Sequence, residues 1–170
     1  MSFKEIEVML SFTEQTNPSS GLASHLLLLA AETRNSEVSK LLLDHGANIK
    51  VQDDDKRTAL HRCQHCPRLG KHGGLKVANL FLDKHGDLLD KQDKSGKTAL
   101  YMACEIGHFD MADLLMKRGA DADVVEVNGR TALYTACEKG ELKIVRRLLQ
   151  HRANPNTAGP GGCTPLVVAV

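Results

Sequence analysis

The sequence predicts an all-α solenoid built from short helix pairs that repeat along the chain. A four-residue motif recurs at steps of 40, 33 and 33 residues, a period typical of repeats that stack on their neighbours. Within each unit, apolar residues recur at helical spacing in two short segments. Neither segment is long enough to form a stable helix alone, so stacking must hold the fold together. The copies of the motif are Thr58-Ala59-Leu60-His61, Thr98-Ala99-Leu100-Tyr101, Thr131-Ala132-Leu133-Tyr134 and Thr164-Pro165-Leu166-Val167.

Residues 1–24 are predicted to form an N-terminal capping helix and a turn. Apolar residues share one face of a helix over residues 3–14, with charged residues on the opposite face. The stretch 17–21 is rich in proline, serine and glycine, which is typical of a turn. The apolar residues of this helix are Phe3, Ile6, Met9 and Leu10.

The repeat region is predicted to span residues 25–170 and to begin with two irregular units. The first unit covers 25–57, and the second covers 58–97 with a seven-residue insertion that falls near 66–74. In the turn before the second unit, Lys56 stands where later turns carry glycine. Because a side chain disfavours the left-handed conformation, we expect a looser or differently shaped hairpin there.

The next two units, 98–130 and 131–163, align without gaps. Each begins with a threonine, whose hydroxyl can accept hydrogen bonds from the free N–H groups of a first helical turn. Small residues follow and allow neighbouring helices to approach closely. A glycine then ends the first helix, because glycine tolerates the left-handed conformation. These threonines and glycines are Thr98, Gly107, Thr131 and Gly140.

A partial unit at 164–170 closes the sequence on an apolar stretch. Such a stretch would expose an uncapped edge of the stack. We therefore expect the chain to be a fragment, or a truncated gene product, of a longer array.

Composition excludes several classes of function. The 22 lysines and arginines nearly balance 21 acidic residues, so a net charge of +1 gives no general attraction to nucleic acid or anionic lipid. Aromatic content is 4%, which argues against base stacking, and the apolar run 26–31 is far too short for membrane insertion. Cys104 and Cys137 lie in apolar stretches, so we expect buried free thiols in a reducing, intracellular compartment, the cytoplasm or the nucleus.

The units share a pattern that resembles the ankyrin repeat, with the Thr-Ala-Leu-(His/Tyr) start and a later Gly-Ala-Asp. The resemblance covers about residues 25–170, or four repeats and a truncated last one. It implies antiparallel helix pairs stacked side by side, with β-hairpin-like loops projecting to one side. It also implies a monomeric, non-catalytic module that binds a protein partner on a concave face made from loop tips and first helices.

Recognition is expected at the variable positions of that face, because the framework positions only present them. A mildly basic strip, formed by Lys94, Lys97, Arg130 and Lys139 beside two glutamates, predicts a partner with acidic patches. Tyr101 and Tyr134 stand in the histidine position of the motif and are predicted to be structural. The expected partner-binding residues are Asp54, Asp55, Arg57, Arg62, Lys94, Ser95, Lys97, Glu105, Ile106, Val127, Asn128, Arg130, Glu138 and Lys139.

Two alternatives stay open. Cys63 and Cys66 have the spacing of a zinc knuckle, and histidines flank them, which indicates a metal-binding module. No second cysteine pair completes a tetrahedral set, and His61 and Cys63 also occupy framework positions, so we expect no metal and no cofactor. No catalytic motif is recognisable. The second alternative is a targeting fragment of a larger multidomain enzyme or effector.

Overall fold

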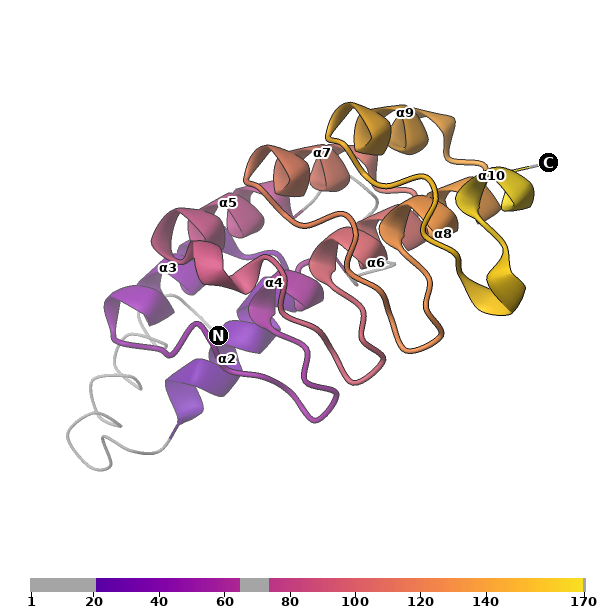
Figure 1. The fold of residues 1–170 in the computed structure, drawn as a ribbon. Coiled ribbons are helices and arrows are strands. Elements are labelled where there is room, and N and C mark those ends of the chain that lie inside the picture. The colour runs from indigo at the N-terminus through magenta and orange to yellow at the C-terminus, as the bar shows by residue number, and fades with distance from the viewer. Residues whose placement is uncertain (1–20, 65–73, 170) are drawn as a thin grey trace.

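The computed structural model describes residues 21–64 and 74–169, and there the predicted all-α solenoid is confirmed (Figure 1). Short helices alternate between two layers as the chain advances. The inner layer contains α2 (Leu22–Glu32), α4 (Ala59–Arg62), α6 (Ala99–Glu105), α8 (Ala132–Glu138) and α10 (Pro165–Val168). The outer layer contains α3 (Ser36–Asp44), α5 (Leu75–Lys84), α7 (Phe109–Lys117) and α9 (Leu142–Gln150). Two 3-10 turns, η2 (Gly86–Leu88) and η3 (Pro160–Gly162), lie in the connecting loops.

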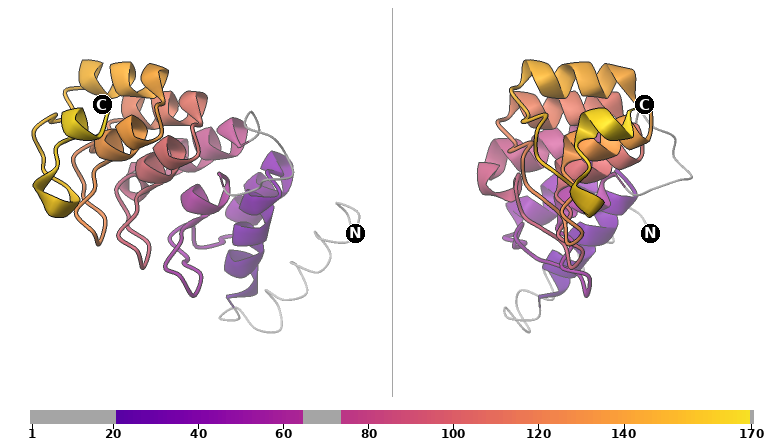
Figure 2. Two further views of the ribbon diagram at one scale, coloured as in Figure 1. Left: turned by 90° about the vertical axis from the view of Figure 1, so that its right-hand side faces the viewer. Right: turned by 45° about the vertical axis from the view of Figure 1, so that its right-hand side comes forward.

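Successive helices of each layer contact one another, and the two helices of each complete repeat also contact one another. The loops that join α3 to α4, α5 to α6, α7 to α8 and α9 to α10 project as a row from the inner layer (Figures 1 and 2). We call the surface formed by these loops and the inner helices the inner face. None of the described helices combines the length and apolar character needed to cross a membrane.

The predicted threonine caps are present. The hydroxyl oxygens of Thr98 and Thr131 accept hydrogen bonds from the backbone N–H groups of Tyr101 and Tyr134, each at 3.2 Å. Such caps satisfy N–H groups that have no partner within the helix. The sequence therefore sets the start of each of these inner helices locally.

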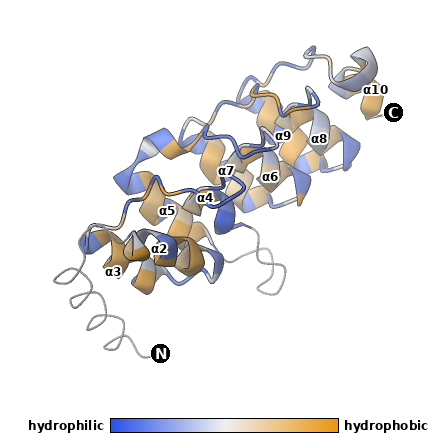
Figure 3. Cartoon of the chain, turned by 90° about the horizontal axis from the view of Figure 1, so that it is seen from below, coloured by the Kyte–Doolittle hydropathy of each residue, from blue (hydrophilic) through white to orange (hydrophobic). Residues whose placement is uncertain are grey.

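One hydrophobic core runs along the stack, because every complete unit contributes equivalent side chains to it. Most hydrophobic residues lie on the helices, whereas the loops are largely hydrophilic (Figure 3). Leu166 holds the motif position of three buried leucines but is 73% exposed at the C-terminal edge. The fully buried core residues include Leu27, Leu60, Leu100 and Leu133 from the inner layer, and Leu42, Phe81, Leu115 and Leu148 from the outer layer.

An acidic side chain closes each of the first three projecting loops from within. The carboxylate of Asp53 accepts hydrogen bonds from the backbone N–H groups of Asp55 and Arg57, at 2.9 and 2.8 Å. Asp93 makes the same two bonds in the next loop, at 2.8 and 2.9 Å. Glu126 takes this place in the third loop, where its carboxylate accepts from the Arg130 N–H at 3.3 Å.

The expectation of a looser hairpin at Lys56 is wrong. Lys56 adopts a φ of 59°, and its N–H donates to the Asp53 carbonyl at 2.9 Å, as Gly96 donates to Asp93 at 3.0 Å. The side-chain amide of Gln52 also donates to the Lys56 carbonyl, at 3.0 Å. These local hydrogen bonds hold the loop in the glycine-like shape even though its residue carries a side chain.

The predicted helix at 3–14 lies outside the described residues, as does most of the insertion at 66–74. Gly74 is described and immediately precedes α5, with a φ of 106°. A Cβ atom there would lie 2.5 Å from the Cys63 carbonyl oxygen, so the chain needs glycine where it enters the outer layer.

Candidate protein-binding face

The expected partner-binding residues fall into two groups on the inner face. The loop tips carry exposed side chains, whereas residues at the loop bases are half-buried against the inner helices. The exposed tip residues are Asp54, Asp55, Lys94, Ser95, Val127 and Asn128. The half-buried residues are Arg57, Arg62, Lys97, Glu105 and Arg130, while Ile106, Glu138 and Lys139 are exposed at the ends of the inner helices.

An identical arrangement of cation, ring and acid occurs in two successive repeats. The Lys97 ammonium lies 2.8 Å from both carboxylate oxygens of Glu105 and 5.5 Å from the centre of the Tyr101 ring. Its counterpart Arg130 lies 3.1 Å from a Glu138 oxygen and 5.6 Å from the centre of the Tyr134 ring. Cation–π contact and ion pairing together hold each basic side chain against the face.

The tyrosines of these arrangements also connect successive repeats. The Thr135 hydroxyl of α8 donates a 2.8 Å hydrogen bond to the Tyr101 hydroxyl of α6. Tyr134 packs against Gly159 of the last loop, where a Cβ atom would lie 2.7 Å from the ring. Their predicted structural role is consistent with both contacts.

Charges are also paired at the N-terminal part of the face. Arg62 forms ion pairs with Glu32 at 2.5 Å and Asp53 at 3.3 Å. Arg57 lies 3.7 Å from Asp55 and 3.8 Å from Asp93. The arginines at this end of the face are therefore paired with carboxylates, as Lys97 and Arg130 are further along it.

His61 supports the fold from beneath this surface. Its Nδ1 accepts from the Thr58 N–H at 3.2 Å, which leaves the Nε2 proton to donate to the Lys97 carbonyl at 3.1 Å. Burial lowers the pKa of His61, and the bond to the Lys97 carbonyl opposes that shift. The neutral ring thus links one repeat to the loop of the next.

Exposed side chains at the loop tips and at the end of α8 are available to a partner. Lys94 and Lys139 form no ion pair with the described residues. Val127 is 68% exposed, and Val125 beside it is also exposed. Sequence reasoning missed Val125, although the valines at 124, 125 and 127 interrupt an otherwise polar loop and could have indicated it.

The alternative metal site is only partly described. Cys66 and the flanking His65 and His72 lie outside the described residues, within which no group of three or more potential ligands gathers. Cys63 is fully buried, its thiol donates to the Leu60 carbonyl at 3.2 Å, and burial raises its pKa to about 12. A metal ligand must be a thiolate, so this environment disfavours Cys63 in that role.

The expectation of buried free thiols holds for one of its two cysteines. Cys63, Cys104, Cys137 and Cys163 are all free. Cys104 is fully buried, and burial raises its pKa. Cys137 is only half-buried.

Comparison with known families finds ankyrin repeats along most of the sequence. A family model described as ankyrin repeats in three copies matches residues 68–159 and 119–170. A model of a single ankyrin repeat matches residues 25–54.

Several larger proteins share this region. A probable 26S proteasome regulatory subunit p28 of Saccharomyces cerevisiae is 34% identical over 100 residues, or 58% of this chain and 41% of that protein. A putative ankyrin repeat protein of fowlpox virus is 34% identical over 98 residues, covering 58% of this chain and 21% of the viral protein. The phosphocholine transferase AnkX of Legionella pneumophila is 26% identical over 97 residues, covering 57% of this chain and 10% of the transferase. The chain thus spans less than half the length of each of these relatives.

Proposed function

Because the chain belongs to the ankyrin repeat family, whose repeats generally mediate protein–protein interaction, we propose that it binds a protein partner on its inner face. The ion-paired residues at the loop bases would form a rigid surface, and the loop tips would make the specific contacts with the partner. We further propose that the module acts as a monomer in the cytoplasm or nucleus and performs no catalysis itself.

The observation that carries this proposal is the repeated arrangement of Lys97, Tyr101 and Glu105, and of Arg130, Tyr134 and Glu138. Side chains held in place before binding lose less conformational entropy when a partner arrives. A surface fixed in this way supports recognition more than flexible, solvated charges would.

The tips suggest the chemistry of the partner. Val127 and Val125 offer an apolar contact, while Lys94 in the preceding loop and Lys139 at the end of α8 add positive charge that no described residue pairs. A partner segment with an aliphatic or aromatic side chain flanked by acidic residues would complement this pattern. The paired Lys97 and Arg130 would then contribute more to shape than to net charge.

Site-specific photo-crosslinking tests the proposal. A photoreactive residue at Val127 or Ser95 should capture the same protein from an extract of the source cells. The same residue at Lys40, exposed on α3 in the outer layer, is the matched control and should capture none of it. A protein captured equally from Lys40, or never from the loop tips, would contradict binding on the inner face.

A second candidate function is targeting within a larger enzyme or effector. The specific support is the match to a phosphocholine transferase, of which the shared region forms only 10%. The full-length transcript tests it: a continuous reading frame into a catalytic domain is the expected result. An isolated reading frame of this length would contradict it.

A further inference from the structure

The outer helix α9 differs in charge from every other described outer helix. It contains Lys143, Arg146 and Arg147 and no acidic residue. By contrast, α3, α5 and α7 each contain at least one aspartate or glutamate. Positive charge is therefore concentrated at one place on a chain whose net charge is only +1.

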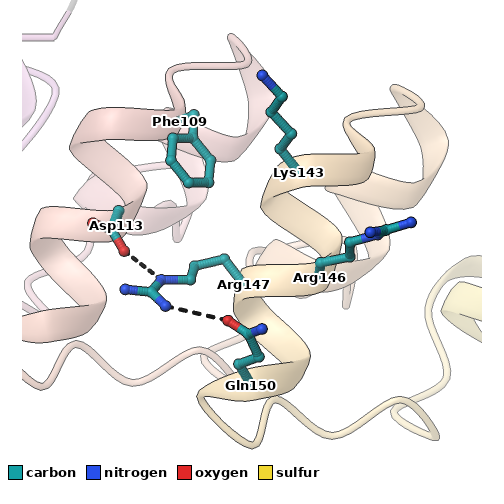
Figure 4. A pocket seen from close by; sticks show the side chains of 6 residues that line it. All are labelled: Phe109, Asp113, Lys143, Arg146, Arg147 and Gln150. Carbon is teal, nitrogen blue, oxygen red and sulfur yellow. Dashed lines mark hydrogen bonds and ion pairs between the residues drawn. The ribbon is translucent and has the colours of Figure 1, made fainter.

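A pocket of about 270 Å³ lies between α7 and α9, on the layer opposite the projecting loops (Figure 4). The Phe109 ring stands at the α7 side of the pocket, and Lys143 extends beside it from α9. Phe109 is 36% exposed, so an apolar surface is open to a ligand. The volume lies just below the range of pockets for whole small molecules, and it suits a single side chain of a larger partner.

The one acidic residue of the pocket is already engaged. The Asp113 carboxylate accepts hydrogen bonds from Arg147 and, at 2.8 Å, from Lys117. Burial raises the pKa of Asp113, but these hydrogen bonds outweigh that effect and lower its pKa overall. Arg147 also donates to the Gln150 side chain at 3.2 Å, so it is held in place from two sides.

Lys143 and Arg146 form no ion pair with the described residues, so their charges are available. Lys143 lies at the Phe109 side of α9, and Arg146 leaves the helix on the side away from α7 (Figure 4). A ligand that crosses α9 would meet one cation on each side and the apolar pocket between the helices.

We propose that this outer pocket is a second protein-binding site, which takes an acidic peptide segment with one apolar side chain. The apolar side chain would pack on Phe109, and carboxylates before and after it would pair with Lys143 and Arg146. A peptide fits better than nucleic acid, because two unpaired cations give little counterion release and the chain offers few aromatic rings for stacking. This site lies on the opposite layer from the inner face and does not depend on binding there.

The test is a fluorescence anisotropy titration of the whole chain with a labelled glutamate peptide that carries one central phenylalanine. We expect saturable binding that weakens by about 10-fold or more in the double variant Lys143→Glu and Arg146→Glu. The matched control is Lys40→Glu with Lys76→Glu, which makes the same charge change at exposed sites on α3 and α5. This control and the inner-face variant Lys97→Glu with Arg130→Glu should each change the affinity by less than about twofold.

Three results would overturn the proposal. The first is equal weakening in both outer-layer double variants, which would indicate general charge attraction. The second is tighter binding of duplex DNA than of the peptide at equal total charge. The third is an unchanged affinity when the peptide's phenylalanine is replaced by glycine. Circular dichroism checks that each variant is folded. The two outer-layer variants change only exposed residues that form no ion pair with the described residues.

Discussion

Three residues adopt a backbone conformation that normally requires glycine. Arg34, Lys56 and Arg152 have φ values of 56°, 59° and 65°. Gly107, Gly96 and Gly119 stand at the corresponding positions of other repeats and also have positive φ, so these turns keep one backbone shape with or without glycine. Sequence reasoning noticed the missing glycine at Lys56 but gave its conformational preference too much weight against the hydrogen bonds of the loop.

Replacing Lys56 by glycine should therefore stabilise the protein. Lys56→Gly removes the strain of a side chain at positive φ, and the gain exceeds the added entropy of the unfolded chain by about 0.5–1 kcal/mol. Gly129 occupies the same turn position, with open space around a Cβ atom, so Gly129→Lys should destabilise by about 1 kcal/mol. Urea unfolding of both variants checks the pair, and a destabilising Lys56→Gly would show that the loop carries no strain.

His61 makes the stability of the fold depend on pH. Because burial lowers its pKa in the folded state, the unfolded chain binds more protons below the ordinary value of 6.5. The free energy of unfolding should thus be highest above that value and decrease as the pH falls from about 7 to about 5. His61→Gln keeps a side chain that can complete the capping box with Thr58 but cannot titrate.

Comparing the pH dependence of stability of His61→Gln with that of the unchanged chain gives the contribution of His61. Urea unfolding at several pH values should give a smaller slope of stability against pH for His61→Gln than for the unchanged chain. Equal slopes of the free energy of unfolding against pH would mean that protonation of His61 does not destabilise the folded state.

At the scale of elements, ion pairs follow the outer layer from repeat to repeat. Lys84 of α5 pairs with Asp44 at 2.9 Å, and Arg118 after α7 pairs with Asp83 at 2.8 Å. Such exposed pairs are screened by solvent, and each contributes little to stability. Buried apolar contacts and the hydrogen bonds between inner helices therefore dominate the cohesion of neighbouring repeats.

The contact between Tyr101 and Thr135 provides a direct test of that cohesion. Tyr101→Phe leaves the buried Thr135 hydroxyl without its partner and should lower the free energy of unfolding by about 1–2 kcal/mol. Tyr134→Phe is the control, because the Tyr134 hydroxyl makes no hydrogen bond with described residues, and it should cost less than about 0.5 kcal/mol. Thermal or urea unfolding measures both, and equal losses would contradict a link through Tyr101.

The sequence predicted the elements well and their side-chain pairing poorly. The capping threonines and small inner residues act within a few positions, so the starts of α6 and α8 could be predicted. The pairs of Lys97 with Glu105 and Arg130 with Glu138 could not, because residues eight apart lie beyond the spacing of three or four at which side chains meet along one helix. The basic strip was predicted to attract acidic patches, whereas two of its four cations, Lys97 and Arg130, are already paired with glutamates.

At the scale of the whole molecule, the repeats form one row in which each unit is stabilised by its neighbours. Truncation of the central leucine Leu100 should strongly destabilise the fold, because its side chain is fully buried between repeats. We expect Leu100→Ala to lower the free energy of unfolding by about 2–5 kcal/mol. Leu166→Ala, at an exposed copy of the same motif position, should change it by less than about 0.5 kcal/mol.

Hydrogen exchange measured on Leu100→Ala and on the unchanged chain tests most directly whether the repeats depend on one another. If each helix pair requires its neighbours, amide protection should fall in α4 and α8 as well as in α6, with the ends of the stack affected least. Loss of protection confined to α6 and α7, with α4 and α8 unchanged, would contradict a fold held together by stacking.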